Sequence, residues 1–235
     1  MLMDQPLRLA VFDVDGTLID SQHVIVAAMI EAWRVHGLGM PDPNAVRRII
    51  GLSLVEAIAA LSPELSPEQH RRMARSYKDA FLALAEGPDH EEPLFPGVMA
   101  ALDALEADGW LLGLATGKSR RGVWRMLDAH GLDGRFVTVQ TADDNPGKPH
   151  PAMLVRAMAE VGVEACDTVM IGDTSYDMQM ARNAGVAAVG VAWGNHPPEE
   201  LTRSGAWDIL ESYDALAGRL DSLIEGFSLV NAKAV

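Results

Sequence analysis

Acidic side chains follow two of the apolar runs in this sequence. Asp13 and Asp15 come directly after the first run, and Asp173 and Asp177 follow a later one. Short apolar runs are typical of buried strands, and sites in parallel α/β sheets lie at the carboxyl ends of the strands. Of Asp13 and Asp15, one carboxylate could attack an electrophile while the other donates and recovers a proton. Turns rich in Asp also follow strands for their backbone hydrogen bonds, so this pair alone leaves a structural role open.

A metal ion is expected among these acids. Four carboxylates at neighbouring strand ends repel one another unless a cation lies between them. An all-oxygen site without His or Cys suits Mg²⁺ better than Zn²⁺. We therefore expect Asp13, Asp173 and a backbone oxygen of Asp15 to hold Mg²⁺. Paired acids near a helix start, such as Asp173 and Asp177, also occur as plain helix caps.

Groups that bind anionic oxygens follow two further apolar runs. In LATGK, Thr116 and Gly117 offer a hydroxyl and a backbone N–H to such an oxygen. In DDNPGKPHP, Lys148 would face the acids from a loop after the third run. A Thr-Gly pair is common in turns, and a lone loop lysine is usually solvated. Together, Lys148 and the metal would offset charge on a transferring phosphoryl group.

The elements that must position these groups alternate between apolar runs and helical patterns. This alternation predicts an α/β fold with a Rossmann-like parallel sheet core and right-handed crossovers. Helices are expected over 97–108, from Ser119 to Gly131, and over 151–160. The predicted strands are 7–12, 111–115, 136–139, 168–171 and 187–191.

A long insertion separates the first two predicted strands. The gap is too long for one crossover helix, and it contains helical patterns over 21–36, 44–61 and 68–84. Val24, Ala28 and Val35 form the apolar stripe expected for the first of these helices. We expect an inserted helical cap domain at 18–92, ended by the turn-rich EGPDHEEPLFPG, and an α/β core domain at 1–17 and 93–235.

Composition narrows the class of partner. The 235 residues carry a formal net charge of −14, which argues against a nucleic acid or an anionic membrane surface as partner. The sequence lacks an apolar stretch near the ~18 residues of a membrane span, and MLMDQPLRLAVFD does not resemble a signal peptide. The single cysteine, Cys166, excludes an intramolecular disulfide. A cytoplasmic enzyme acting on a small metabolite is expected, and the oligomeric state is left open.

Four motifs in order resemble those of one known family. The chain resembles the haloacid dehalogenase-like (HAD) phosphohydrolase superfamily, in its subgroup with a helical cap after the first strand. The motifs that carry this resemblance are, in order, DVDGT, Thr116, Lys148 and GDTSYD. The resemblance covers nearly the whole chain. It implies a phosphatase in which Asp13 attacks phosphorus to form an aspartyl phosphate. Asp15 would protonate the leaving alcohol and later activate water.

The same resemblance implies roles for the other motif residues. Thr116 would bind the phosphoryl oxygens, and Lys148 would neutralise the nucleophile and the phosphate. Asp173 would bind Mg²⁺, and Asp177 would support the metal shell. The dehalogenases of the superfamily lack an aspartate at the position of Asp15 and need no magnesium, so the aspartate present here favours a phosphatase.

The substrate is expected to be selected by the cap. Thr17 is the residue type that the phosphatases of the superfamily have at this position. The segment IIGLSLVEAI resembles a specificity loop of phosphoglycolate phosphatases and their pyrophosphatase relatives. Sugar phosphomutases of the superfamily tend to have an Arg where this chain has Leu54. Arg47, Arg48 and Gly51 are the cap candidates, although adjacent arginines on a helix cannot both point inward. An inward arginine would favour a substrate that bears a carboxylate, such as 2-phosphoglycolate.

Three alternatives stay open at this point. A sugar phosphomutase or a pyrophosphatase of the same superfamily would use the same core motifs. A phosphoacceptor signalling module also gathers an Asp, a Thr and a Lys at the ends of parallel strands. Such modules contain no large cap insertion and do not need an acid-base residue like Asp15, which favours the enzyme.

Overall fold

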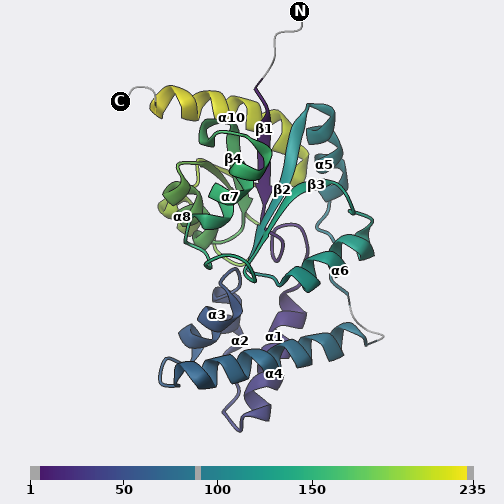
Figure 1. Ribbon diagram of the computed structural model, residues 1–235, viewed down its shortest axis with the longest axis vertical. Coiled ribbons are helices and arrows are strands. Elements are labelled where there is room, and N and C mark those ends of the chain that lie inside the picture. The colour runs from purple at the N-terminus through teal and green to yellow at the C-terminus, as the bar shows by residue number, and fades with distance from the viewer. Residues whose placement is uncertain (1–5, 88–90, 232–235) are drawn as a thin grey trace, which may run out of the picture.

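The fold is built around one parallel sheet. A computed structural model describes residues 6–87 and 91–231, with side chains described as far as 227 (Figure 1). Within these residues, six parallel strands lie in the order β3-β2-β1-β4-β5-β6, which confirms the predicted α/β fold. The strands are β1 (Arg8–Phe12), β2 (Trp110–Thr116), β3 (Phe136–Thr141), β4 (Thr168–Gly172), β5 (Ala187–Val191) and β6 (Asp208–Leu210).

Two details of the sheet differ from the sequence prediction. The edge strand β6 was not predicted, because three residues are too few to show an apolar period. Strands β2 and β3 also extend past the predicted ends at 115 and 139. Thr116 is consequently the last residue of β2 rather than part of the turn that follows it.

Strand register brings the sequence motifs to one edge. Phe12 at the end of β1 pairs with Leu114 of β2 on one side and with Ile171 of β4 on the other. The backbone N–H of Asp13 donates to the carbonyl of Ile171 at 2.9 Å, so pairing continues past the end of the strand. The three strands therefore end side by side, and the residues that follow them lie close together.

Helices cover both faces of the sheet. In β1, Ala10 and Phe12 pack into the apolar core on one face, and Leu9 and Val11 pack into the core on the other. Burial on both faces explains why these strands have continuous apolar runs instead of alternating patterns. The first face is covered by α5 (Val98–Ala107), α6 (Arg120–His130) and α10 (Leu216–Asn231), and the second by α7 (Ala152–Val161), α8 (Ser175–Ala184) and α9 (Pro198–Ser204).

The insertion after β1 forms a separate helical layer, which we call the cap. In Figure 1 its helices lie beyond the sheet edge at which β1 and β2 end. They enclose an apolar core of their own that contains Met29, Trp33, Ile58 and Met73. The cap helices are α1 (Gln22–Val35), α2 (Pro43–Arg48), α3 (Leu54–Leu61) and α4 (Pro67–Ala85).

Two predictions for the cap are wrong in detail. The pattern over 44–61 is two helices, because the chain turns at 49–53, where Gly51 has φ +99°, a conformation that a helix cannot contain. Val35 is 57% exposed at the end of α1, whereas Val24 and Ala28 are buried as predicted.

Two parts of the prediction are not decided by the fold. The domain bounds at 18–92 and 93–235 stay a prediction, and residues 88–90 of the turn-rich segment lie outside the described residues. No helix in the described part of the chain is long and apolar enough to cross a membrane.

Candidate active site

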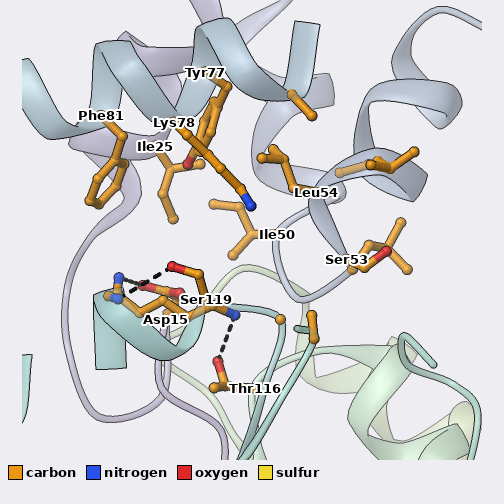
Figure 2. A pocket seen from close by; sticks show the side chains of 18 of the residues that line it. Asp15, Ile25, Ile50, Ser53, Leu54, Tyr77, Lys78, Phe81, Thr116 and Ser119 are labelled. Atoms are coloured by element: carbon orange, nitrogen blue, oxygen red, sulfur yellow. Dashed lines mark hydrogen bonds and ion pairs between the residues drawn. The ribbon is translucent and has the colours of Figure 1, made fainter. Parts of the chain in front are cut away.

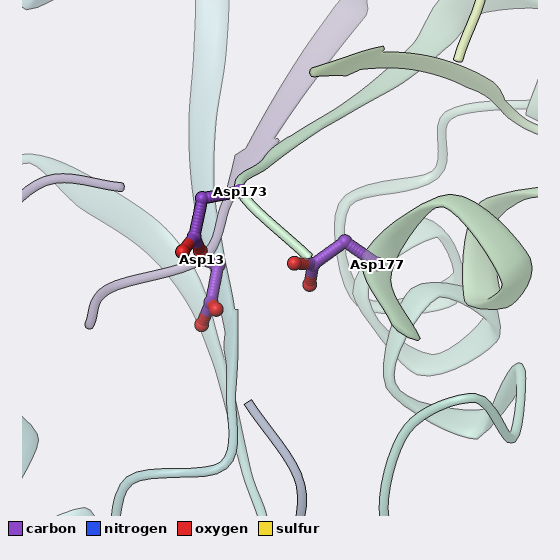
Figure 3. Close-up of side chains that lie close together, drawn as sticks. All are labelled: Asp13, Asp173 and Asp177. Carbon is purple, nitrogen blue, oxygen red and sulfur yellow. The ribbon is translucent and has the colours of Figure 1, made fainter. Parts of the chain in front are cut away.

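Three carboxylates meet where β1 and β4 end. Asp13, Asp173 and Asp177 are each at most 1% exposed, and one oxygen from each lies within 4.8 Å of the others (Figure 3). Asp13 follows β1, Asp173 follows β4, and Asp177 stands in the first turn of α8. The structure thus brings Asp13 together with two acids from a distant part of the sequence.

Lys148 enters this cluster from the loop after β3. Its Nζ lies 2.9 Å from Oδ1 of Asp13 and 2.6 Å from Oδ1 of Asp177. Burial lowers the pKa of the Lys148 ammonium, but the two neighbouring carboxylates raise the pKa by more, so the group stays charged. The lysine that sequence reasoning placed opposite the acids therefore contacts two of them.

The cluster carries more negative charge than one lysine can balance. Burial raises the pKa of Asp13 to about 8, although the charge of Lys148 acts against this shift. Burial and then the charge of Asp177 raise the pKa of Asp173 to about 7. Oδ2 of Asp13 is buried and has no hydrogen-bond partner in the described part of the chain. These groups fit a divalent cation that prefers oxygen ligands, which is the preference of Mg²⁺.

Asp173 is held by neighbours on both of its oxygens. Oδ1 accepts a hydrogen bond from the Thr17 hydroxyl at 3.1 Å, and Oδ2 accepts from the backbone and side-chain N–H groups of Asn195, both at 2.8 Å. A Cβ on Gly16 would lie 2.3 Å from Oδ2 of Asp173, so the backbone approaches this carboxylate closely. Gly16 also has φ +86°, a left-handed conformation that glycine adopts readily.

Asp177 is positioned by the start of its own helix. Oδ2 accepts from the backbone N–H and the hydroxyl of Thr174 at 3.0 and 2.6 Å, while Oδ1 faces Lys148. Thr174 and Asp177 form a reciprocal capping box. The capping role that the sequence left open therefore exists, and it fixes Asp177 beside Lys148.

Asp15 points away from this cluster toward a cavity. It is 8% exposed, and its Oδ1 accepts from the Ser21 hydroxyl at 2.6 Å and from Lys118 Nζ at 2.7 Å. Thr116 and Gly117 line the same cavity, and the Thr116 hydroxyl oxygen accepts from the backbone N–H of Lys118 at 3.1 Å. The two acids of DVDGT thus occupy different surroundings, with Asp13 beside Lys148 in the carboxylate cluster and Asp15 beside Lys118 and Ser21.

The cavity lies between the core and the cap and has a volume of about 630 Å³ (Figure 2). We call its core side, with Asp13, Asp15 and Thr116, the floor, and its cap side the roof. Lys78 of α4 extends its amino group from the roof into the cavity. Otherwise the roof is largely apolar, with Ile25, Met29, Ile50, Leu52, Leu54, Ala57, Ala74 and Phe81 among its lining residues.

The cap candidates from the sequence divide in two. Gly51 lines the cavity, but Arg47 and Arg48 are not among the lining residues found in the described part of the chain. Arg47 donates to the side chain of Asn44 at 2.9 Å, and Arg48 pairs with Glu200 of α9 at 2.7 Å. The turn after α2 directs 50–54 into the cavity and leaves the arginines outside it.

Several residues of the site were missed by sequence reasoning. Asn195 follows β5, and a search of every strand end for polar side chains would have found it. Lys118 stands within the quoted LATGK, but a lysine beside a turn gives no signal of its own. Ser21 and Glu92 flank the cap and reach Asp15 and Lys118 only through the fold.

Comparisons with known proteins agree with this geometry. The family model for haloacid dehalogenase-like hydrolases matches residues 10–191. Probable phosphatase IndB of Dickeya dadantii (strain 3937) is 36% identical over 222 residues, which cover 92% of this chain and 95% of that protein. Phosphoglycolate phosphatase of Vibrio vulnificus (strain YJ016) is 30% identical over 212 residues, 86% and 91% of the two chains. Pyrophosphatase PpaX of Bacillus pumilus (strain SAFR-032) is 29% identical over 199 residues, 84% and 89% of the two chains.

Proposed function

Because the chain belongs to the haloacid dehalogenase-like hydrolases, we propose that it is a Mg²⁺-dependent phosphatase of small phosphomonoesters that reacts through an aspartyl phosphate on Asp13. The observation that carries this proposal is the meeting of Asp13 with Lys148, Asp173 and Asp177 at the sheet edge, next to a cavity that also contains Asp15. A buried nucleophile beside a separate acid-base group is the arrangement that covalent phosphoryl transfer needs.

The two acids divide the reaction between them. A carboxylate oxygen of Asp13 forms a bond to phosphorus while the bond from phosphorus to the alcohol oxygen breaks. Asp15 gives its proton to that oxygen, and then takes a proton from the water that hydrolyses the aspartyl phosphate. Its position on the cavity floor supports this role. Each turnover consumes one water, releases the alcohol and phosphate, and restores both carboxyl groups.

Other groups at this edge of the sheet bind the phosphoryl group or neutralise charge beside it. The Thr116 hydroxyl and the Gly117 backbone N–H offer hydrogen bonds to the phosphoryl oxygens, and Lys148 offsets negative charge beside Asp13. Asp13, Asp173 and a backbone oxygen of Asp15 would hold Mg²⁺, with Asp177 in support. When bound, Mg²⁺ supplies positive charge that draws the phosphoryl group in and stabilises the charge that develops on it.

The substrate is proposed to resemble 2-phosphoglycolate, with a carboxylate as its second charged group. The loop similarity that favoured this substrate includes Gly51, which lines the cavity. Since neither cap arginine lines it, the cationic role passes to Lys78, whose amino group has no ion pair within the described residues. Arg121 of α6 is a second lining cation without such a partner there. In a chain of net charge −14, both attract an anionic substrate locally.

A single panel of substrates tests the proposal. Phosphate release is measured with Mg²⁺ for 2-phosphoglycolate, sugar phosphates, nucleotides and pyrophosphate. We expect hydrolysis of monoesters, with the highest kcat/KM for 2-phosphoglycolate. Conversion of β-glucose 1-phosphate to glucose 6-phosphate without phosphate release would indicate a mutase, and a preference for pyrophosphate would indicate a pyrophosphatase. A long-lived aspartyl phosphate with negligible turnover would indicate a signalling module.

The setting of the enzyme is also proposed. The net charge of −14 supports a small metabolite over a nucleic acid or an anionic membrane as partner. The single cysteine, Cys166, cannot form a disulfide within the chain. This supports a cytoplasmic location, because disulfides are rare in proteins of reducing compartments.

A further inference from the structure

Lys118 is a buried cation to which the reaction above assigns no task. Its side chain is 7% exposed, and its Nζ lies 2.7 Å from Oδ1 of Asp15 and 3.0 Å from Oε1 of Glu92. Burial lowers the pKa of the Lys118 ammonium, but Asp15 and Glu92 together raise the pKa by more, so it stays charged. A buried ammonium between two carboxylates fixes the direction in which each one points.

Among the described residues, the hydrogen bonds to the Asp15 carboxyl group are all on one of its oxygens. Oδ1 accepts hydrogen bonds from both the Ser21 hydroxyl, at 2.6 Å, and Lys118 Nζ. Oδ2 has no hydrogen-bond partner within the described residues, and Asp15 lines the cavity. Oδ1 is therefore held in place, while Oδ2 is left to exchange a proton with the substrate. A proton-transfer group must reach its partner atom within hydrogen-bond distance, so holding Oδ1 has a direct consequence for rate.

Glu92 in turn is fixed to the core helix α6. Its side chain is 7% exposed, its Oε2 lies 3.9 Å from the Arg125 guanidinium, and its backbone carbonyl accepts from His130 at 2.9 Å. Glu92 belongs to the segment that returns from the cap, whereas Ser21 belongs to the segment that enters it. The carboxyl group of Asp15 is thus bound, directly or through Lys118, to both segments that connect core and cap.

A residue of the cap covers this arrangement. The ring of Phe81 on α4 lies 5.2 Å from Lys118 Nζ and 5.4 Å from the Arg125 guanidinium carbon. Both distances are in the range of cation–π attraction, and an aromatic ring over an ammonium also keeps water from it. The cap therefore contributes to the surroundings of Asp15 through Lys118.

We propose that Lys118 is a positioning residue that orients Asp15 for proton transfer, and that Phe81 completes this arrangement from the cap. The inference rests on the proposed function, since it takes Asp15 as the proton donor. Oδ2 of Asp15 gives its proton to the leaving alcohol oxygen and takes one back from the attacking water, while Lys118 gains and loses none. The proposed role of the ammonium is to fix the direction of Oδ1.

The test compares two leaving groups in a single turnover. An alkoxide needs a proton to leave, whereas p-nitrophenolate leaves without one. With enzyme in excess, Lys118→Met should slow release of glycolate from 2-phosphoglycolate by about 10²-fold, the scale of acid-base assistance. Release of p-nitrophenol from its phosphate should slow by less than about fivefold. Lys118→Arg should restore part of the first rate, and the KM for 2-phosphoglycolate should change little.

Companion variants keep the test decisive. Arg120→Met, which removes an exposed cation of α6 that pairs with Asp144, is the matched control and should change neither rate. Should Lys118→Met not fold, Glu92→Gln and Phe81→Leu carry the test, with smaller losses that follow the same leaving-group order. Equal losses on both substrates, or glycolate release within threefold of the parent, would overturn the role of Lys118. Failure of the proposed function is seen separately, as turnover that survives in Asp13→Asn.

Discussion

The floor and the roof of the cavity are built in opposite ways. Beneath the floor residue Asp13, Lys148 lies between Asp13 and Asp177, at 2.9 and 2.6 Å, and all three side chains are almost fully buried. On the roof, Lys78 is exposed to the cavity among apolar side chains and has no ion pair within the described residues. A phosphoryl group is the same in every phosphomonoester, whereas the alcohol differs. The fixed floor therefore suits the common part of the substrate, and the roof suits the part that varies.

The largest effect should come from the floor. Asp13→Asn removes the proposed nucleophile while keeping the size of the side chain, so turnover of every monoester should fall by about 10⁴-fold or more. The measurement is phosphate release, with circular dichroism and thermal unfolding to show that the fold is retained. Residual turnover within about tenfold of the parent would show that Asp13 is not the nucleophile and that the floor has been misassigned.

A roof substitution should act on one class of substrate. Lys78→Met removes the cation that would meet the substrate carboxylate, so the KM for 2-phosphoglycolate should rise about tenfold, equivalent to about 1.4 kcal/mol. The KM for ethyl phosphate, which has no second charge, should stay within twofold. Arg75→Met is the matched control, since Arg75 stands on the same helix with an exposed side chain beside Glu68. An equal rise for both substrates would remove the selective role of Lys78.

The same contrast explains how much could be read from the sequence. Thr116 ends a strand, and Asp13, Lys148 and Asp173 each follow one. A parallel sheet brings strand ends to one edge, so order along the chain indicates proximity. The α/β fold and the inserted cap were predictable for the same reason. For a side chain of the roof, by contrast, the direction in which it points depends on the residue at which its helix ends, and order along the chain does not indicate this.

The cap arginines show this limit. Helix α2 ends at Arg48 and the chain turns at 49–53, and neither arginine is among the cavity-lining residues found in the described part of the chain. Nothing in the apolar period signals that change, because the period continues through 44–61. Lys78 lies in a helix whose pattern was predicted correctly, but a lysine on an amphipathic helix is ordinarily a solvated one.

The excess charge of the floor should appear in thermal stability. Burial raises the pKa of Asp13 to about 8 and of Asp173 to about 7, from ordinary values of 3.8. The folded metal-free protein then binds more protons than the unfolded chain between these values, so its free energy of unfolding falls as pH rises from 6 to 8. The proposed Mg²⁺ would pair with the charged carboxylates, so its addition should raise Tm more at pH 8 than at pH 6.

This prediction is checked by thermal unfolding in EDTA and in saturating Mg²⁺ at the two pH values. Asp13→Asn supplies the control, because it removes one of the two titrating groups and should reduce the difference between them. A shift in Tm with Mg²⁺ that is the same at pH 6 and pH 8 would show that these carboxylates are already charged without the metal. Repulsion among the buried carboxylates would then cost less stability than their burial indicates.

The smallest effect should come from the seam between cap and core, outside the cavity. Arg48 pairs with Glu200 at 2.7 Å with its side chain 48% exposed, while its backbone carbonyl accepts from Tyr176 and His196. Arg48→Met removes only the ion pair, which at such exposure contributes less than about 1 kcal/mol, so Tm should fall by less than about 4 °C. The KM for 2-phosphoglycolate should stay within twofold, since the guanidinium lies outside the cavity. A tenfold rise in KM without loss of Tm would instead place Arg48 on the substrate, and selection would then extend beyond the roof to α2.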